Sequence, residues 1–206
     1  MITTRSAAFV LALCAAGCGP NQIRVLVPPR LDLKSYGRLG LVTFTVENAT
    51  GSIPQLLTDR FEEEALSAQP GIEMFELGPL DSTLDAARAQ KIGKQRNLAA
   101  VFAGTLRVSR PQARGGITGN LVPHVEESIR FDLSVWLVST ASGGTVWRSG
   151  SWDTESVGQV SFAGGMLNFV AQDPKAAYGG IVNRLVNLVG EDLWSRWEWQ
   201  TQTQTH

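Results

Sequence analysis

Few side chains in this sequence of 206 residues are suited to catalysis or to metal binding. The chain contains two cysteines, Cys14 and Cys18, and two histidines, His124 and His206. A metal centre or a nucleophile–base pair needs several such groups brought together, and His206 is the last residue of the chain. His124 follows a proline in an expected loop, where a surface histidine is a simpler interpretation than a catalytic base. We therefore expect no metal site, no cofactor and no enzyme activity.

Two further segments resemble catalytic motifs only in composition. Three consecutive glutamates, residues 62–64, lie in an expected helix, so they should fan out over its solvated side and not converge as an acid–base pair. The glycine-rich segment Arg114–Gly119 lies between two expected strands. A phosphate-binding loop needs a helix N-terminus to supply its amides, so this segment is predicted to be a hairpin loop.

Cys18 is suited to lipidation. An apolar run from Ala7 to Ala16 follows Arg5, and small residues stand directly before Cys18. The run matches the apolar region of a secretion signal and is much shorter than the roughly 20 residues of a membrane-spanning helix. The pattern resembles the bacterial lipobox, in which the cysteine is acylated and becomes the first residue of the mature chain. This resemblance implies a signal peptide at residues 1–17 and a lipid on Cys18; the alternative is an ordinary cleaved signal followed by a chance cysteine.

The residues after Cys18 predict a short tether. Prolines at positions 20, 28 and 29 disfavour regular structure, so residues 18–34 are interpreted as the lipidated cysteine and its tether. Sixteen extended residues reach at most about 50 Å, which keeps the folded part near the membrane. Gly19, where an aspartate would signal retention, resembles an outer-membrane sorting signal. We expect a protein anchored in the outer membrane and facing the periplasm, with residues 200–206 as a disordered polar tail.

The charge balance excludes two classes of protein. The chain has 18 basic and 19 acidic residues and a formal charge of −1, and 43% of its residues are apolar. No basic excess is present to neutralise nucleic-acid phosphates, and the apolar content is sufficient for a packed core. We expect one folded domain and no nucleic-acid partner.

Hydrophobic periodicity predicts a single α/β domain over residues 35–199. Strands are expected at 39–46, 72–77 and 98–108, and helices at 53–69, preceded by a capping box of Ser52 and Gln55, and at 84–96. Residues 127–139 and 144–155 should form a long hairpin, and a last helix should run from Asp173 to about Trp197. The predicted fold is a mixed β-sheet with βαβαβ order, then the long β-hairpin, then a C-terminal helix packed on the sheet.

Several of these segments resemble a known superfamily. They are the strand Gly37–Phe44, the helix near Ser52, the helix Ala86–Gly93, the strand Ala99–Thr105 and the hairpin Val135–Trp147. Together with the cysteine tether they are similar to the superfamily of the curli-secretion lipoprotein and the penicillin-binding-protein-activator lipoprotein, over roughly residues 36–156. The resemblance implies a non-catalytic α/β domain of the cell envelope that works by binding other proteins.

Three segments are candidates for a partner-binding surface. The first is the loop 109–124 with Arg110 and Arg114, which could equally be a disordered connection. The second is the segment 157–170 with Phe162, Met166 and Phe169, which could instead pack inside the domain. The third is the tryptophan-rich end with Trp199, since indole rings favour interfaces and membrane headgroup layers.

The expected function follows from the lipid anchor and from the scarcity of catalytic and metal-binding side chains. We expect a scaffold or accessory subunit whose partners are the membrane, through the lipid on Cys18, and envelope proteins, with a second copy of the chain as one option. The alternative is an auxiliary or ligand-binding lipoprotein of a lipid or small-molecule transporter. A deep apolar cavity under the last helix would favour that alternative.

Overall fold

The computed structural model describes residues 22–81, 83–109, 112–117, 123–156, 161–163, 166–169 and 174–201. The chain divides into two compact units. Residues Pro29–Trp194 form an α/β domain, and Met1–Pro28 together with Ser195–His206 form the second unit. No helix in the described part of the chain is long and apolar enough to cross a membrane.

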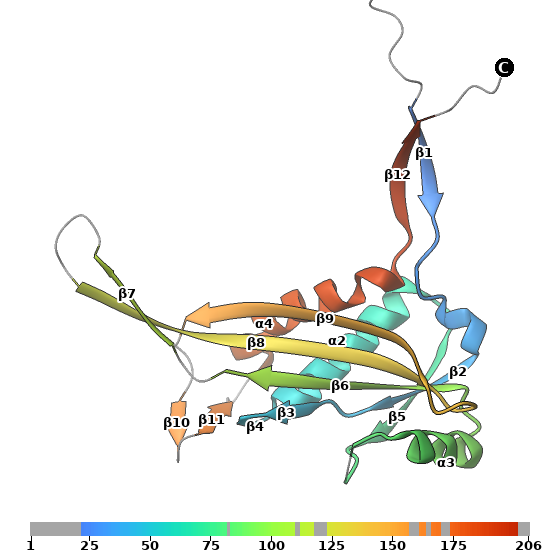
Figure 1. Cartoon of the computed structure of the whole chain (residues 1–206), viewed down its shortest axis with the longest axis horizontal. Coiled ribbons are helices and arrows are strands. Elements are labelled where there is room, and N and C mark those ends of the chain that lie inside the picture. The colour runs from blue at the N-terminus through green and yellow to red at the C-terminus, as the bar shows by residue number, and fades with distance from the viewer. Residues whose placement is uncertain are drawn as a thin grey trace, which may run out of the picture. The chain divides into compact units, whose positions relative to one another are not determined.

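The α/β domain is built on a mixed sheet that has seven strands within the described residues (Figure 1). In spatial order five of them are β5 (Glu73–Gly78), β2 (Arg38–Val42), β6 (Ala100–Val108), β8 (Pro123–Ser139) and β7 (Gln112–Ile117), while β3 (Thr45–Glu47) pairs with β6 and β9 (Thr145–Ser156) pairs with β8. Strand β2 is parallel to β5 and β6, and the pairs β6–β8 and β8–β9 are antiparallel.

The connections follow the predicted order. Helix α2 (Ile53–Ala68) lies between β2 and β5 in the chain, and α3 (Ala86–Arg96) lies between β5 and β6. The hairpin β8–β9 and helix α4 (Pro174–Val189) complete the domain. The predicted fold class, βαβαβ followed by a long hairpin and a C-terminal helix on the sheet, is confirmed. A small sheet of β10 (Ser161–Ala163), β11 (Met166–Phe169) and β4 (Ala49–Gly51) was not predicted.

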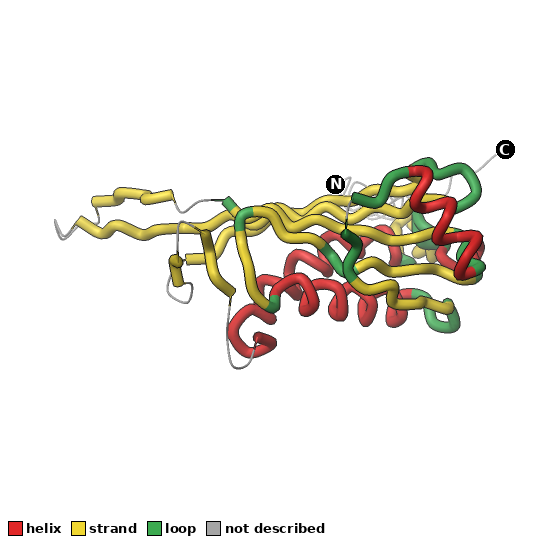
Figure 2. The backbone as a smooth tube through the Cα atoms, turned by 90° about the horizontal axis from the view of Figure 1, so that it is seen from below, coloured by secondary structure: helices red, strands yellow, loops and turns green. Residues whose placement is uncertain are grey.

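The helices cover the two faces of the sheet unequally. Figure 2 shows α2 and α4 together on one face, with α3 on the opposite side. The main core lies under α2 and α4 and includes Phe61, Phe102 and Leu185. A much smaller cluster under α3 consists of Val42, Leu98 and Val101. One face of the sheet is therefore covered along its length, and the other only near α3.

Side-chain alternation along the strands matches this arrangement. On β8, Phe131, Leu133, Val135 and Leu137 are buried in the main core, whereas Ser134 on the other face is exposed. The predicted division of this strand into a core face and a partly wet face is confirmed. Strand β6 is buried on both faces from Ala100 to Gly104, but Arg107 near its end is exposed. Burial on both faces is thus confined to the first half of β6.

One helix terminus has a cap that the sequence analysis did not identify, and another corrects an expected cap. The Asp85 side chain accepts a hydrogen bond from the backbone N–H of Arg88 and caps α3. Ser52 makes no side-chain capping bond to α2, and Gln55 instead donates to Asp59, so the expected capping box is wrong. Helix α4 ends at Val189, well before Trp197, because Gly190 begins a 3-10 turn, η3 (Gly190–Leu193), and Trp194 is extended.

The amino-terminal boundary of the domain also differs from the prediction. The compact unit begins at Pro29, six residues before the expected boundary, and Leu31 and Leu33 are buried in its core. The buried side chain of Gln69 accepts from the Leu33 amide and donates to the carbonyls of Leu31 and Leu193. These bonds fix the segment before the short 3-10 turn η2 (Leu33–Tyr36) to the end of α2.

The second unit contains a two-stranded ribbon. Strand β1 (Gln22–Val27) pairs antiparallel with β12 (Arg196–Thr201) from Gln22 opposite Thr201 to Val27 opposite Arg196. Residues 22–27, expected in the tether, and residues 200–201, expected in a disordered tail, both lie in this ribbon. The alternation Ile23, Val25, Val27 is a strand pattern, but its partner lies about 170 residues away in the sequence, so no local signal identifies the pairing.

Phe102→Ala tests the position of β6 at the centre of the core. Phe102 is fully buried and packs edge-on against Phe61 and Trp147, at centroid distances of 5.1 and 6.0 Å. Removing the ring should lower the free energy of unfolding by roughly 3–5 kcal/mol through the cavity left behind. Denaturant unfolding measures this loss. A loss below about 1 kcal/mol, which is the typical effect of a point substitution taken over all positions, would contradict the central position of β6 between β2 and β8.

Candidate functional site

The uncovered part of the sheet is the most extended functional candidate among the described residues. We call it the open face, and it lies on the side of β3, β6, β8 and β9 that α2 and α4 do not cover. Its side chains come from alternate positions: Thr45, Glu47, Thr105, Arg107, Arg130, Asp132, Ser134, Trp136, Arg148 and Trp152. The face exists because β6 and β8 carry most of their large apolar groups on the side that α2 and α4 cover, so the hydrophobic effect does not favour a full second helix layer on the other side.

Charged groups form a row across the open face. The Arg107 guanidinium lies 2.8 Å from the Glu47 carboxylate, and Arg107 stands opposite Asp132 in the register. Arg130 donates through Nε and Nη2 to Asp132, at 2.9 and 2.7 Å. Hydrogen bonds to these carboxylates raise the pKa values of Arg107 and Arg130 above the ordinary guanidinium value. Both cations therefore stay charged and are each held by a neighbouring carboxylate on the face.

Two indole rings accompany these charges. The guanidinium carbon of Arg130 lies 4.4 Å from the centroid of the Trp152 ring, and that of Arg148 lies 5.6 Å from Trp136. Trp152 is 58% exposed, whereas the large side chain of tryptophan normally buries most of its surface. Stacked arginine and exposed tryptophan are the side chains that most often contribute binding energy at protein interfaces. The sequence analysis did not identify them, although Trp136 and Trp152 fall on predicted strands.

A small hollow borders the open face near α3. It has a volume of about 40 Å³, and Thr45, Thr105, Trp136, Leu80 and Leu84 are among its lining residues. A volume of this size accommodates one small side chain and no drug-sized ligand, which requires at least several hundred Å³.

A larger groove of about 310 Å³ lies between α2 and α4. Its lining includes Asp59, Glu63 and Asn183 and is polar. Arg60 also lines this groove. The alternative function required a deep apolar cavity under the last helix, and the lining of this groove does not have that character.

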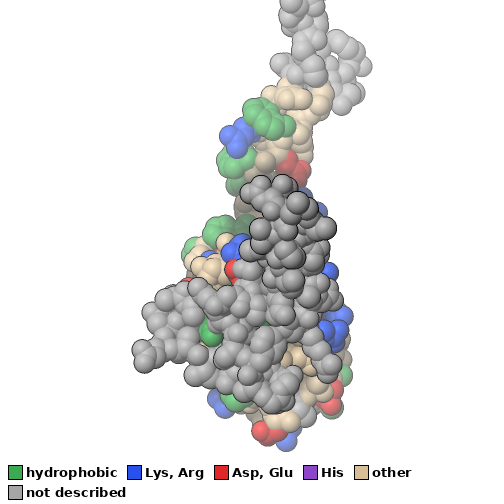
Figure 3. Space-filling view, turned by 90° about the vertical axis from the view of Figure 1, so that its left-hand side faces the viewer, with side chains coloured by type: hydrophobic (Ala, Val, Ile, Leu, Met, Phe, Trp, Pro, Cys, Tyr) green, Lys and Arg blue, Asp and Glu red, His purple; other side chains and the backbone are tan. Residues whose placement is uncertain are grey.

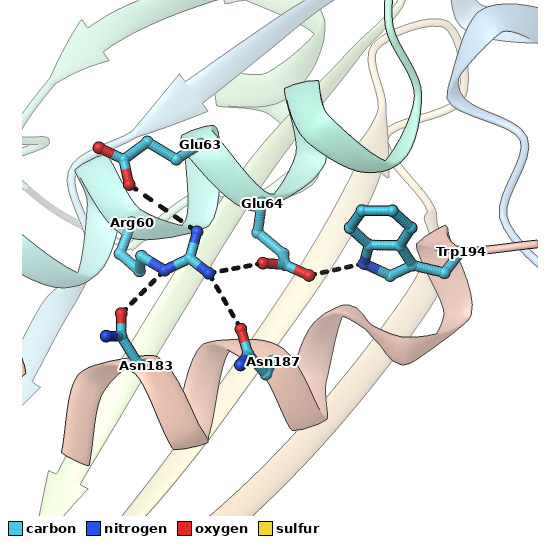
Figure 4. Close-up of polar contacts among 6 residues, drawn as sticks. All are labelled: Arg60, Glu63, Glu64, Asn183, Asn187 and Trp194. Atoms are coloured by element: carbon cyan, nitrogen blue, oxygen red, sulfur yellow. Dashed lines mark hydrogen bonds and ion pairs between the residues drawn. The ribbon is translucent and has the colours of Figure 1, made fainter. Parts of the chain in front are cut away.

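The Arg60 side chain joins α2 to α4 beside this groove (Figure 4). Its Nε donates to Asn183 at 2.8 Å, and its Nη2 donates to Asn187 at 3.1 Å and to Glu64 at 2.8 Å. Glu64 also accepts a 2.6 Å hydrogen bond from the indole N–H of Trp194. Because its donors are directed at groups of the protein itself, Arg60 acts as a clamp between two helices.

Glu64 corrects one detail of the sequence analysis. It is only 6% exposed, so the three consecutive glutamates do not all lie on the solvated side of α2. Glu62 faces another way, toward Glu76 on β5, and partial burial together with that carboxylate raises the pKa of Glu62. Neither described pocket is lined by Glu62 or Glu76, and no group of three or more potential metal ligands occurs among the described residues.

The predicted contact residues have different outcomes. Cys18 and Arg110 lie outside the described residues. Phe162 lies in β10, Met166 and Phe169 lie in β11, and Arg114 lies in β7, so these backbone positions are in strands, but their side chains are not described. Strand β11 pairs with β4, which follows β3 of the open face after one residue, Asn48. The described residues of the predicted segment 157–170, which are 161–163 and 166–169, are thus linked to the open face through β4 and the adjoining β3.

Trp199 lies on the ribbon and not on a helix. Trp199 and Trp197 are 64% and 58% exposed, and the guanidinium of Arg24 lies 5.6 and 5.4 Å from their ring centroids. Figure 3 shows a basic side chain beside apolar ones on the ribbon. Trp197 does not belong to the last helix, which was expected to run to about this residue, because α4 ends at Val189.

Arg60→Met tests whether the clamp is structural. The substitution leaves the buried carboxylate of Glu64 with one partner, Trp194, so the free energy of unfolding should fall by about 1–3 kcal/mol in denaturant titrations. Arg96→Met on exposed α3 is the control and should change it by no more than about 0.5 kcal/mol. Equal behaviour of the two variants would show that the clamp adds nothing to stability and would make Arg60 a candidate for ligand binding instead.

Comparisons with known proteins reach only the level of the fold. No family model matches the sequence, and no curated protein matches it. Similar solved structures include the PelC dodecamer from Paraburkholderia phytofirmans, with 11% identity, a TM-score of 0.48, and coverage of 86% of this chain and 100% of that chain. Others are the lipoprotein GNA1162 from Neisseria meningitidis, with 14% identity, a TM-score of 0.37, and coverage of 72% and 96%, and the LpoB C-terminal domain from Salmonella enterica, with 12% identity, a TM-score of 0.36, and coverage of 57% and 83%.

Proposed function

We propose that this chain is a lipid-anchored, non-catalytic protein of the bacterial envelope that acts as a scaffold or accessory subunit. The observation that carries the proposal is the open face, a flat surface with exposed Trp152 and stacked arginines in place of a catalytic cleft. The partner is a protein that lays an apolar and hydrogen-bonding surface on this face.

The chemistry of the open face suits protein contacts. Arg107 and Arg130 are already paired with carboxylates, so a partner need not neutralise them and can stack against their planes. The exposed hydroxyl of Ser134 lies between the charged row and Trp136, where it can exchange hydrogen bonds with a partner, whereas the Thr45 hydroxyl is bonded to that of Thr105 at 2.9 Å. An indole with a polar rim is the usual arrangement of an interface hot spot. Phe162, Met166, Phe169, Arg110 and Arg114 remain proposed contacts that would extend this surface.

The anchor places this surface close to a membrane. Cys18 precedes strand β1 by four residues, a span of at most about 14 Å. An acyl chain on Cys18 would therefore hold the ribbon against the lipid surface. A two-stranded ribbon is marginally stable in water by itself, and exposed tryptophans with an arginine are side chains that favour the headgroup layer. Gly19 favours the outer membrane as the site of anchoring.

Cys18→Ser tests the anchor. Without an acylated cysteine the protein should appear in the soluble fraction or keep its signal peptide, and metabolic labelling with a fatty acid should give no signal. Cys14→Ser is the matched control, because Cys14 lies inside the expected signal peptide and its loss should change neither result. If the processed Cys18→Ser protein stayed in the membrane fraction at the level of the unmodified chain, the lipid would not be the anchor.

A double substitution tests the open face. Thr45→Lys with Ser134→Lys places two long charged side chains in the middle of the face at exposed positions. The free energy of unfolding should change by less than about 0.5 kcal/mol at Ser134 and fall by about 1 kcal/mol at Thr45, whose hydroxyl loses its hydrogen bond to Thr105. Envelope proteins that are cross-linked to the unmodified chain in intact membranes and identified by mass spectrometry should be lost from the variant.

The control adds the same charge at exposed positions away from the middle of the open face. Ala141→Lys with Thr145→Lys alters exposed residues at the β8–β9 turn and should retain the cross-linked partners. Partners that survive both double substitutions bind elsewhere, and if every partner survived, the open face would be withdrawn as the contact surface.

A further inference from the structure

The free edge of strand β9 presents backbone N–H and C=O groups in the alternation that pairing with another strand requires. Within the described residues β9 pairs only with β8, so its other side is an outer edge of the sheet (Figure 1). In β8 the backbone N–H of Arg130 donates to the Ser109 hydroxyl, and its C=O accepts from the Ser109 N–H; Ser109 follows β6. Successive residues of a strand direct these groups to opposite sides. The even-numbered residues of β8 therefore direct their backbone groups toward β6, and the odd-numbered ones toward β9. By this alternation Ser149 and Ser151 of β9 bond to β8, and Arg148, Gly150 and Trp152 direct their N–H and C=O groups outward.

This edge lacks the features by which proteins prevent strand pairing. It has no proline and no lysine between Thr145 and Ser156, and its register with β8 is regular from Trp147 onward. The centre of the strand is Ser149-Gly150-Ser151, where small side chains permit close approach of another backbone. The Thr154 amide is bonded to the Asp153 side chain, which limits the free stretch to about five residues around Gly150.

The side chains of β9 are complementary to those of β9 from a second copy. When two such strands pair antiparallel with Gly150 opposite Gly150, each outward residue stands directly opposite another, and Arg148 of each copy stands opposite Trp152 of the other. Arg148 has no carboxylate partner among the described residues and lies 5.6 Å from the Trp136 ring centroid, and Trp152, although stacked by Arg130, is still 58% exposed. The two-fold arrangement therefore forms the Arg–Trp contact twice.

Helix α4 provides a second, independent observation at the same point. Leu185 accepts a hydrogen bond from Ser151 through its carbonyl, and Asp192 accepts one from the Trp147 indole, so Leu188 lies beside Ser149 and Gly150. Arg184, four residues earlier, contacts Asp153 and Glu155 of β9, which places Leu188 on the same side of the helix, away from α2. Leu188 is 48% exposed, and the two-fold axis through Gly150 would bring it against its counterpart.

From these observations we infer that the chain self-associates as a two-fold dimer through β9, with Gly150 at the axis. The sheets of the two copies become one continuous sheet, with Arg148–Trp152 contacts on one face and Leu188 against Leu188 on the other. This inference goes beyond the proposed function and does not depend on it, because neither lipidation nor an envelope partner enters it.

Cysteine cross-linking tests both the dimer and its register. The experiment uses the full-length chain with Ser at positions 14 and 18, so that an introduced cysteine is the only thiol. In Gly150→Cys the paired Cα atoms would lie about 5.5 Å apart, within the range that a disulfide spans. A Cβ at Gly150 meets only ordinary contacts, 3.5 Å from the Leu133 carbonyl oxygen at the closest, so the substitution is tolerated. In Arg148→Cys the two sulfurs are separated by roughly four residues, about 13 Å, which is too far.

The inference predicts four results. The cysteine-free chain sediments as a dimer. On oxidation Gly150→Cys forms a disulfide-linked dimer, whereas Arg148→Cys alone forms none. A mixture of Arg148→Cys and Trp152→Cys, prepared under reducing conditions and then oxidised, also forms a disulfide-linked dimer. Gly150→Pro, which removes only an outward N–H, should give a monomer with an unchanged circular dichroism spectrum. If that variant fails to fold, Leu188→Glu takes its place and should weaken the dimer.

Three results would overturn the inference. The first is a monomer at every concentration in sedimentation, which is also the result expected if β9 pairs with a strand of a different protein. The second is a dimer or larger assembly in which Gly150→Cys does not cross-link or Arg148→Cys cross-links with itself, since either would require another register or another edge. The third is a Gly150→Pro protein that folds and remains dimeric.

Discussion

A row of aromatic rings holds the layers of the domain together. Phe44, Phe61, Phe102 and Trp147 follow one another with centroid distances of 5.4, 5.1 and 6.0 Å, and they belong to the segment after β2, to α2, to β6 and to β9. Gly104 makes room for the first ring, since an added Cβ would lie 2.8 Å from Phe44. Because these large groups all lie on one side of the sheet, the hydrophobic driving force for covering the sheet is also one-sided. The open face is the consequence on the other side.

Sequence periodicity predicts those elements whose burial is decided locally. On β8 every second residue is apolar, and the core face follows directly from that alternation. In α4 the same approach fails for Leu188, which continues the helical spacing of Ile181 and Leu185 but is 48% exposed, because beyond Leu185 the helix packs on its neighbours through Val186 and Val189. The predicted extension of this helix to Trp197 is wrong because apolar residues continue at helical spacing past Gly190, whereas the α-helical backbone does not continue there.

The functional surfaces are harder to predict than the fold. The scarcity of nucleophile, base and metal-ligand groups in the sequence argues against catalysis without any structural knowledge. The pairing of Glu47 with Arg107, and of Glu64 with Trp194, depends on residues 60 and 130 positions apart, so only the folded chain brings them together. Trp152 stands in a predicted strand, and its exposure follows only from knowing which side of the sheet is uncovered.

The two compact units are joined by short connections, and this affects how strong the binding surface needs to be. The chain passes between them once at Pro28–Pro29 and once at Trp194–Ser195. With an anchor at Cys18, four residues before β1, both units would be confined within a few tens of ångströms of one membrane. Confinement of two proteins to the same surface raises their effective concentration, as a short linker does. A flat face without a deep pocket, with a few arginine and tryptophan side chains, can then bind a membrane partner that it would hold only weakly in free solution.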